Sequence, residues 1–254
     1  MTQVLQSVAS FQAWRKENVG TVTLGFVPTM GGLHEGHLAL VRRALEENDK
    51  VAVSVYLNRT QFNKLEDFEK YPAVFEEDLR MLDELGVDAV FAPSYEEMYP
   101  DDYRYKVSES ELSTELEGEH RPGHFDGVLT VVLKLLMAAN ATRAYFGEKD
   151  WQQLALVKGM VDAFFLPVEI VPCPTIREES GLAMSSRNRR LSTEGLEKAA
   201  RFNQILNTAE SEESAVAALN SEGFEAEYVA DRGDRRLGAV VLEGVRLIDN
   251  VERS

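Results

Sequence analysis

Phe26-Val-Pro-Thr-Met-Gly-Gly-Leu-His-Glu-Gly-His37 is the stretch of sequence that decides the fold. An apolar, strand-like run ends at a turn with two glycines, Gly31 and Gly32, and a helical pattern begins directly after the turn. A strand that leads through a glycine turn into a helix is typical of the βα unit of a parallel α/β sheet. We therefore expect an α/β fold whose functional groups lie where this strand ends.

The helix start in this stretch predicts a phosphate site. Free backbone N–H groups and a partial positive charge favour an anion there, and Gly31, Gly32 and Gly36 allow a phosphate to come close. His34 and His37 can donate hydrogen bonds to phosphate oxygens as negative charge develops on a leaving group. A plain glycine turn, followed by histidines that cap or coat the helix, is the alternative.

Through about residue 172, apolar runs alternate with helical patterns, which predicts βαβ units and a Rossmann-like, doubly wound parallel sheet. The expected strands are 22–27, 51–57, 87–92, 143–146 and 168–171, and the clearest helices are 37–47, 74–85, 128–139 and 150–164. Pro172-Cys-Pro174 interrupts this pattern, because proline suits neither a helix interior nor a central strand. We therefore expect a domain of residues 1–174 and a second, smaller α+β domain of residues 175–254. Its expected helices are about 193–207 and 211–221, and its strands lie near 227–230, 239–242 and 246–248.

Charge and cysteine content narrow the class of protein. The 254 residues include 27 basic and 43 acidic ones, a net charge of −16, which disfavours binding to nucleic acid or to an anionic membrane. The one cysteine, Cys173, cannot form an internal disulfide and is expected to be a packed thiol. We see neither a leader pattern nor a run of about 20 apolar residues. A cytoplasmic protein that binds neither nucleic acid nor membrane is expected.

Two further segments carry groups suited to a nucleotide. In Phe146-Gly-Glu-Lys-Asp-Trp-Gln-Gln153, Lys149 can pair with a phosphate, and Asp150 can cap a helix or accept from a ribose hydroxyl. In Gly181-Leu-Ala-Met-Ser-Ser-Arg-Asn188, a serine loop with Arg187 can fold over a triphosphate and neutralise charge in the transition state. A capped surface helix and a solvated loop are the plainer interpretations of these segments.

Amides and carboxylates complete the candidate groups. Asn58-Arg-Thr-Gln-Phe62 directly follows the strand at 51–57, so Gln61 can hold hydroxyls or the carboxylate of an acid. Gln153 offers a donor and an acceptor to a polar substrate. Glu76-Glu77-Asp78 offers a carboxylate to a nucleotide-bound Mg²⁺, although a solvated acidic helix face explains most of these residues as well.

The His-x-Gly-His turn together with the Met-Ser-Ser-Arg loop resembles the nucleotidyl transferase superfamily, which includes class I aminoacyl-tRNA synthetases and small adenylyl- and cytidylyltransferases. Further segments are Val27-Pro-Thr-Met-Gly31, Glu66-Asp67 with Tyr71-Pro72, Leu116-Glu-Gly118, Arg121-Pro-Gly-His-Phe125-Asp-Gly127, Phe146-Gly-Glu-Lys-Asp150, Gly181-Leu-Ala-Met-Ser-Ser-Arg-Asn188 and Arg246-Leu-Ile-Asp-Asn250. In this order they resemble the pantothenate synthetase (pantoate–β-alanine ligase) family, over about residues 20–250.

This resemblance implies that ATP, pantoate and β-alanine are substrates, and that pantothenate, AMP and pyrophosphate are products. A carboxylate is a poor electrophile, so pantoate first attacks the α-phosphorus of ATP to form a pantoyl adenylate. The neutral amine of β-alanine then attacks this mixed anhydride. Positioning and charge stabilisation dominate both steps. The resemblance also implies Mg²⁺ with ATP, and a homodimer.

Each position that matches the family pattern receives an implied role. The expected catalytic residues are His34, His37, Lys149 and Arg187, with His37 as the proton donor. Expected nucleotide contacts are Met30, Gly31, Gly32, His34, Gly36, His37, Gly147, Glu148, Lys149, Asp150, Ile176, Met184, Ser185, Ser186 and Arg187. Expected substrate contacts are Met30, Gln61 and Gln153 for pantoate and Asn58 for β-alanine. Asp78, with Glu77 beside it, is the expected Mg²⁺ ligand.

One turn departs from the family's pattern, since Asn58 is followed by Arg59-Thr60 where the family usually has Pro-Met. This change alters both the stiffness and the polarity of the turn. An adenylyl- or cytidylyltransferase is a second possible function, for which a phosphate acceptor would call for extra Arg or Lys near Gln61, and Arg59 is one such residue. A non-catalytic nucleotide-binding protein is a third, against which the retained histidines and cations argue.

Overall fold

The structure, a computed structural model, describes residues 1–63, 68–72 and 74–253. The chain forms two compact units. The first contains Met1–Gly147 and Gln152–Cys173, and the second contains Glu148–Trp151 and Pro174–Ser254. The main part of the second unit thus begins at Pro174, the second proline of the pair, but the unit also includes a short segment from the middle of the chain. Nothing in the sequence pattern indicated that this segment packs there.

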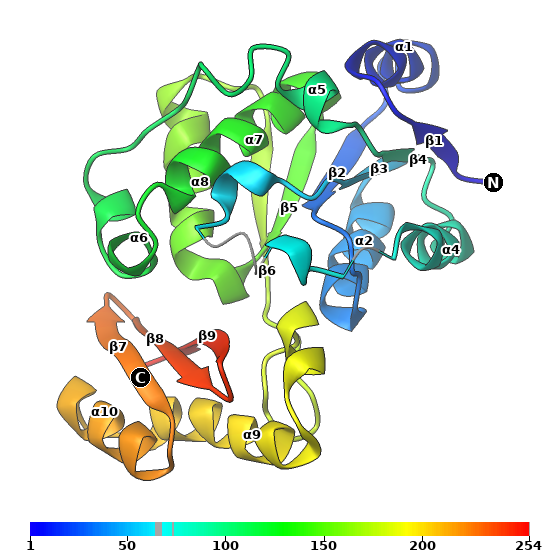
Figure 1. Ribbon diagram of the computed structural model, residues 1–254. Helices are drawn as coiled ribbons and strands as arrows, with labels where there is room; N and C mark the ends of the chain where they lie inside the picture. The colour runs from blue at the N-terminus through cyan, green and yellow to red at the C-terminus, as the bar shows by residue number, and fades with distance from the viewer. Residues whose placement is uncertain (64–67, 73, 254) are drawn as a thin grey trace. The chain divides into compact units, whose positions relative to one another are not determined.

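The first unit is built on a six-stranded, fully parallel sheet, which confirms the predicted α/β fold (Figure 1). Its strands are β1 (Gln3–Leu5), β2 (Leu24–Thr29), β3 (Lys50–Val55), β4 (Ala89–Phe91), β5 (Arg143–Gly147) and β6 (Glu169–Cys173), in the order β1-β4-β3-β2-β5-β6. The chain builds outward from β2 through β3 and β4, then returns to place β5 on the other side of β2. Doubly wound sheets bind ligands at the carboxyl ends of the strands where the order reverses in this way.

Helices cover both faces of this sheet because successive strand residues point to opposite sides. Phe26 packs in a core with α1 (Val8–Asn18), α7 (His124–Ala139) and α8 (Trp151–Ala163). Its neighbour Val27 packs in a second core with α2 (Glu35–Glu47) and α4 (Phe75–Leu85). The short elements are α5 (Tyr95–Met98), α6 (Glu117–His120) and the 3₁₀ turns η1 (Arg59–Gln61), η2 (Leu112–Thr114), η3 (Glu148–Asp150) and η4 (Ser186–Arg190).

The two strands that contain a proline, β2 and β6, each end two residues later than predicted. Pro28 is tolerated in β2 because its missing N–H faces β5, and β2 pairs with β5 only at Gly25 and Phe26. Pro172 is tolerated because β6 lies at the edge of the sheet. Strand β1 and helix α1 were not predicted: β1 has three residues, and α1 buries only Phe11 and Trp14.

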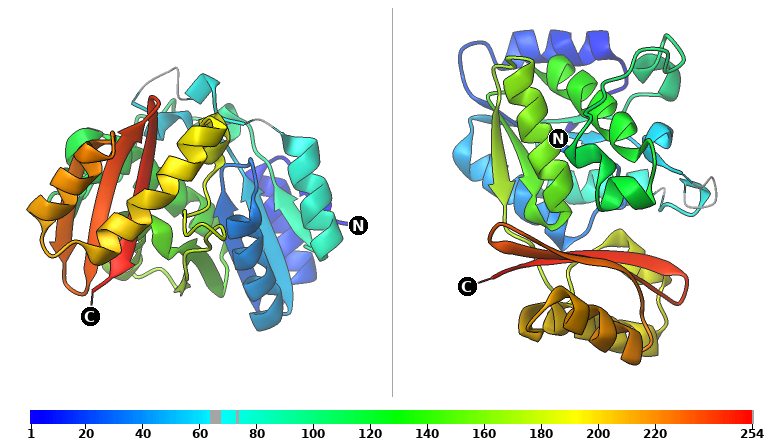
Figure 2. Two further views of the ribbon diagram at one scale, coloured as in Figure 1. Left: turned by 90° about the horizontal axis from the view of Figure 1, so that it is seen from below. Right: turned by 90° about the vertical axis from the view of Figure 1, so that its left-hand side faces the viewer.

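The second unit is a small α+β unit, as predicted. Strands β7 (Glu225–Arg232), β8 (Arg235–Leu242) and β9 (Val245–Glu252) form an antiparallel sheet in the order β7-β8-β9. Helices α9 (Thr193–Thr208) and α10 (Glu212–Ser221) pack on one face of this sheet, as the right-hand view of Figure 2 shows. Both turn residues between β8 and β9, Glu243 and Gly244, have positive φ (52° and 71°), which suits a two-residue hairpin.

Within the described part of the chain, no helix is both long enough and apolar enough to cross a membrane.

Candidate functional site

A buried carboxylate from α4 holds the turn between β2 and α2. Asp78 is 1 % exposed, and its two oxygens accept the backbone N–H groups of Gly32 and Leu33, each at 2.8 Å. Gly31 and Gly32 have positive φ angles of 82° and 62°. A Cβ on Gly31 would lie 2.9 Å from Asp78 Oδ2, so only glycine allows the carboxylate to come this close.

The N–H groups of this turn are already used within the protein. Gly31 N donates to Thr29 Oγ1 at 3.2 Å, and Gly36 N donates to His34 Nδ1 at 3.2 Å. His34 N donates to His37 Nδ1 at 3.4 Å. The N–H groups of Gly31, His34 and Gly36 are therefore not free in this structure, and the phosphate site at this helix start stays a prediction. The glycines serve the geometry of the turn, and the imidazoles are the groups suited to meet a phosphate.

The imidazole pair has a defined arrangement. The ring centroids of His34 and His37 lie 4.1 Å apart, and each Nδ1 accepts a backbone N–H in a reciprocal cap of α2. A neutral ring whose Nδ1 accepts a hydrogen bond carries its proton on Nε2. Each ring can therefore donate from Nε2, the chemistry required to bind phosphate oxygens.

Asn58 lies directly after β3 and is fully occupied by the protein. Its side chain is 1 % exposed. The amide nitrogen donates to Gln61 Oε1 at 3.0 Å and to the carbonyl of Gly127 at 3.2 Å. The amide oxygen accepts from the hydroxyls of Tyr99 at 2.9 Å and Thr60 at 3.0 Å. An asparagine side chain makes about four hydrogen bonds at most. The predicted contact of Asn58 with β-alanine does not fit this structure, which gives the residue a supporting role.

The unusual Arg59-Thr60 turn is held by tyrosines. Thr60 Oγ1 lies 3.3 Å from the Tyr99 hydroxyl in addition to its bond with Asn58. Burial raises the pKa of Tyr99 well above its ordinary value, so this hydroxyl stays protonated and can donate to Asn58. The guanidinium of Arg59 lies 5.1 Å from the ring centroid of Tyr95 on α5, within the range of a cation–π contact. Arg59 is thus engaged with a tyrosine, and polar contacts replace the stiffness of the family's Pro-Met.

Gln61 is positioned by the segment 121–127. The ring of His124 bonds through Nδ1 to the carbonyl of Gln61 at 2.9 Å, and Arg121 Nη1 lies 3.0 Å from His124 Nε2. Because a carbonyl only accepts and a guanidinium only donates, Nδ1 carries the proton of this ring. A Cβ on Gly127 would lie 2.7 Å from the Gln61 backbone, so a glycine lets α7 approach the turn. Sequence reasoning quoted this motif without giving it a role.

Asp78 and Glu77, the two predicted Mg²⁺ ligands, have different surroundings, and their role toward the metal stays a prediction. Both Asp78 oxygens accept backbone N–H groups inside the protein, whereas Glu77 is exposed on α4. The described residues contain no group of three or more His, Cys, Asp or Glu side chains that could hold a metal ion. The structure shows Asp78 as the anchor of the β2–α2 turn. The Glu66-Asp67 part of the sequence pattern lies outside the described residues.

Two predicted nucleotide segments come together inside the second unit. Lys149, Ser185 and Arg187 line one hollow, together with Leu182, Ala183, Asn188, Phe202 and the β9 residues 246–249. Ser185 caps η4 by accepting from Arg187 N at 3.3 Å, and Met184 N donates to the carbonyl of Ile176 at 3.0 Å.

The other predicted site residues are half-buried. In the first unit, Met30 and Gly147 are half-buried at the ends of β2 and β5, and Gln153 is half-buried on the first turn of α8. In the second, Glu148 and Asp150 belong to η3, and Ile176, Met184 and Ser186 are half-buried. Gln152, beside Gln153, is 3 % exposed and supports residues 112–117 through three hydrogen bonds, a role that sequence reasoning missed.

Comparison with known proteins decides the family. The sequence model described as pantoate-β-alanine ligase matches residues 3–252. The chain belongs to the pantoate–β-alanine ligase family. This ligase is 55 % identical over 252 residues to the pantothenate synthetase of Bdellovibrio bacteriovorus, covering 99 % of this chain and 100 % of that relative. It is 47 % identical over 251 residues to the pantothenate synthetase of Coxiella burnetii, covering 99 % and 97 % of the two chains.

Solved structures agree with this assignment. The fold of this ligase matches the pantoate–β-alanine ligase of Francisella tularensis, complexed with β-γ ATP and β-alanine, with a TM-score of 0.95 at 39 % identity over 99 % and 98 % of the chains. It matches the pantothenate synthetase of Thermus thermophilus with a TM-score of 0.91 at 42 % identity over 99 % of both chains. The chain is an ATP-dependent ligase that joins pantoate to β-alanine, so the transferase and the non-catalytic alternatives are set aside.

Proposed function

We propose that this ligase forms a pantoyl adenylate at the carboxyl end of β2 and then converts it into pantothenate with β-alanine. One contact carries this proposal: Gln61 Nε2 lies 3.2 Å from the sulfur of Met30. Met30 begins the turn that ends in His34 and His37, so the amide suited to the acid adjoins the imidazoles suited to phosphate. The first step requires a site of this kind, where the carboxylate of pantoate can reach the α-phosphorus of ATP.

In the first step, a carboxylate oxygen of pantoate forms a bond to the α-phosphorus of ATP. The bond from this phosphorus to the oxygen of the β-phosphate breaks, and pyrophosphate leaves with the electron pair. Negative charge grows on the leaving group, where the Nε2–H groups of His34 and His37 donate hydrogen bonds, with His37 in the proton-donor role. Lys149 and Arg187 supply positive charge to the phosphates.

In the second step, the neutral amine of β-alanine attacks the acyl carbon of the adenylate. The bond from this carbon to the AMP oxygen breaks, AMP leaves, and the amine loses a proton to solvent. Met30, Gln61 and Gln153 hold pantoate through both steps. The remaining proposed nucleotide contacts are Gly31, Gly32, Gly36, Gly147, Glu148, Asp150, Ile176, Met184, Ser185 and Ser186.

Three further properties are proposed on the family resemblance. Mg²⁺ accompanies ATP, and its ligands include the nucleotide phosphates and water, since Mg²⁺ usually keeps several waters. Asp78 and Glu77 are the proposed side-chain ligands of this ion. The ligase is a homodimer and acts in the cytoplasm, which sedimentation and cell fractionation would test.

Pyrophosphate release tests the order of the two steps. We expect release from ATP, Mg²⁺ and pantoate alone in a burst of about one equivalent per active site, with turnover only after β-alanine is added. Omission of pantoate should abolish the burst. Release that requires β-alanine before any pyrophosphate appears would rule out a free-standing adenylate step.

A further inference from the structure

Two neighbouring residues at the end of the Arg246-Leu-Ile-Asp-Asn250 motif are polar but buried in β9. Asp249 is 4 % exposed and Asn250 is 2 % exposed. Successive residues of a strand point to opposite faces of its sheet. Asp249 lies on the face covered by α9, where Asn203 contacts it, and Asn250 lies on the opposite face. One strand can therefore hold a different segment on each side.

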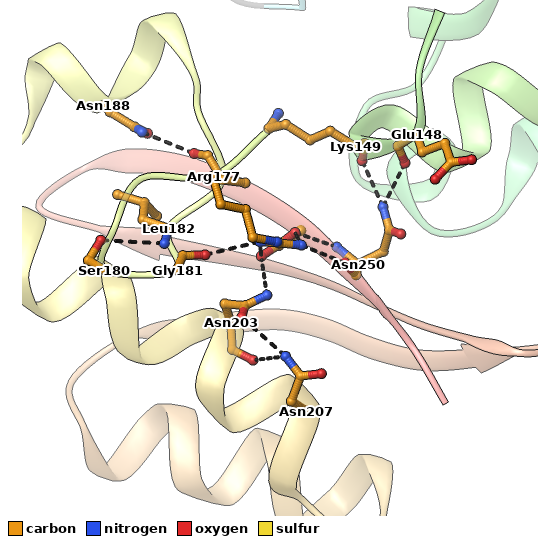
Figure 3. A network of polar contacts seen from close by, with 12 residues as sticks. Glu148, Lys149, Arg177, Ser180, Gly181, Leu182, Asn188, Asn203, Asn207 and Asn250 are labelled. Carbon is orange, nitrogen blue, oxygen red and sulfur yellow. Dashed lines mark hydrogen bonds and ion pairs between the residues drawn. The ribbon is translucent and has the colours of Figure 1, made fainter. Parts of the chain in front are cut away.

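Asn250 holds the backbone of the segment that carries Lys149 (Figure 3). Its amide nitrogen donates to the carbonyls of Glu148 at 2.8 Å and Lys149 at 3.0 Å. Arg235 donates to the amide oxygen of Asn250 at 2.9 Å, and also to the Glu148 carboxylate at 3.1 Å. Since a guanidinium only donates, Arg235 fixes the orientation of the amide, and the NH₂ group faces the two carbonyls.

Asp249 holds the loop that carries Arg187. Its carboxylate forms a two-point ion pair with Arg177, at 2.7 Å and 3.0 Å. Arg177 also donates to the carbonyls of Gly181 and Asn250, each at 3.1 Å. A single antiparallel β-bridge joins Arg177 to Ala183, so the loop leads directly into the Ser185–Arg187 turn. Figure 3 shows Lys149 and Arg177 on segments that meet at Asn250.

We propose that Asn250 and Asp249 are positioning residues for the nucleotide, which fasten Lys149 and the Arg187 loop to one strand and so fix the two cations relative to each other. This inference rests on the proposed roles of Lys149 and Arg187. Its physical reason is that η3 buries none of its own residues, so hydrogen bonds to its backbone have to hold it in the second unit. A displacement of about 1 Å in a positioning group can cost about 100-fold in rate.

The variant Asn250→Asp tests the proposal. It keeps the size of the side chain and the partner of Arg235, but it replaces the two N–H donors with an oxygen that repels both carbonyls. We expect kcat/KM for ATP in adenylate formation to fall about 10-fold to 100-fold. The KM for pantoate should change by less than about threefold. Hydrogen exchange of residues 148–152 should become faster.

Asn18→Asp is the matched control. Asn18 is the last residue of α1 in the first unit, its amide donates to the carbonyl of Trp14 at 2.9 Å, and it is exposed. The same chemical change there should leave the kinetics and the exchange of residues 148–152 as in the wild type. If Asn250→Asp does not fold, Asn250→Ser, which removes the two donors without adding charge, takes its place.

A double-mutant cycle separates positioning from general destabilisation. In a Lys149→Ala background, Asn250→Asp should lower kcat/KM for ATP by less than about threefold, because the side chain that Asn250 positions is gone. The proposal would be overturned if Asn250→Asp lowered kcat/KM for ATP equally with and without Lys149, or if the hydrogen exchange of residues 148–152 did not change. If Lys149→Ala alone leaves adenylate formation unchanged while Asn250→Asp still loosens the segment, the proposed role of Lys149 fails and the fastening by Asn250 stands.

Discussion

Substitution of Asp78 by asparagine should destabilise the first unit without any nucleotide or metal present. The asparagine oxygen can accept from only one of the two N–H groups that Asp78 now serves at 2.8 Å, and its NH₂ group faces the other. A hydrogen bond to a buried charged group contributes about 1.5–3 kcal/mol, and a neutral one about 1 kcal/mol. Loss of one bond and weakening of the other lower the free energy of unfolding by about 3 kcal/mol. The midpoint temperature should fall by about 6–12 °C for a chain of this size.

Differential scanning calorimetry without ATP and Mg²⁺ measures this effect. Glu77→Gln is the control, because it removes the same charge from the neighbouring, exposed position, and it should change stability by less than about 0.5 kcal/mol. The turn role of Asp78 predicts that the two variants differ strongly in the apo protein. Equal melting of both variants, combined with a raised Mg²⁺ requirement of Asp78→Asn, would refute the turn role of Asp78 and leave it the role of a metal ligand alone.

Three further predictions concern other groups. Thr60→Val removes the hydroxyl that donates to Asn58, so the KM for pantoate in steady-state kinetics should rise about threefold to tenfold. Thr60→Ser keeps the hydroxyl and should stay close to wild type. An equal rise in the KM for ATP would contradict this prediction. His37→Ala should slow adenylate formation by about 10² to 10³, measured as pyrophosphate release in a single turnover. A rate reduced by less than about threefold would remove His37 from its role. Burial, and then the hydrogen bond to Glu47, raise the pKa of Tyr145 to about 12. An unfolded tyrosine titrates near pH 10, so the contribution of Tyr145 to stability is complete below about pH 10 and is lost as the pH rises to about 12. Urea unfolding between about pH 10 and about pH 12 should show that the free energy of unfolding falls less in Tyr145→Phe than in the wild type. An equal fall in both proteins would contradict this account.

The order of strands and helices was predictable because it depends on local periodicity. The strand that ends at Thr29, the glycine turn and the helix that begins at Glu35 are all encoded within one short stretch. The same stretch placed His34 and His37 at the carboxyl end of the sheet. Strand β1 escaped prediction because three residues are too few to show a period, and it exists only through its pairing with β4.

The partners of the polar side chains were decided by the tertiary structure. Asp78 is more than forty positions from Gly32 in the sequence, and Tyr99 is about as far from Asn58. Whether a carboxylate binds a metal or a backbone turn, and whether an amide meets a substrate or a neighbour, depends on which groups the packing brings within about 3 Å. Sequence alone therefore determined the family, the sheet and the imidazole pair. Only the folded chain decided that Asp78 and Asn58 are supports, and that Lys149 is held by the strand carrying Asn250, because such contacts join segments that have no local pattern in common.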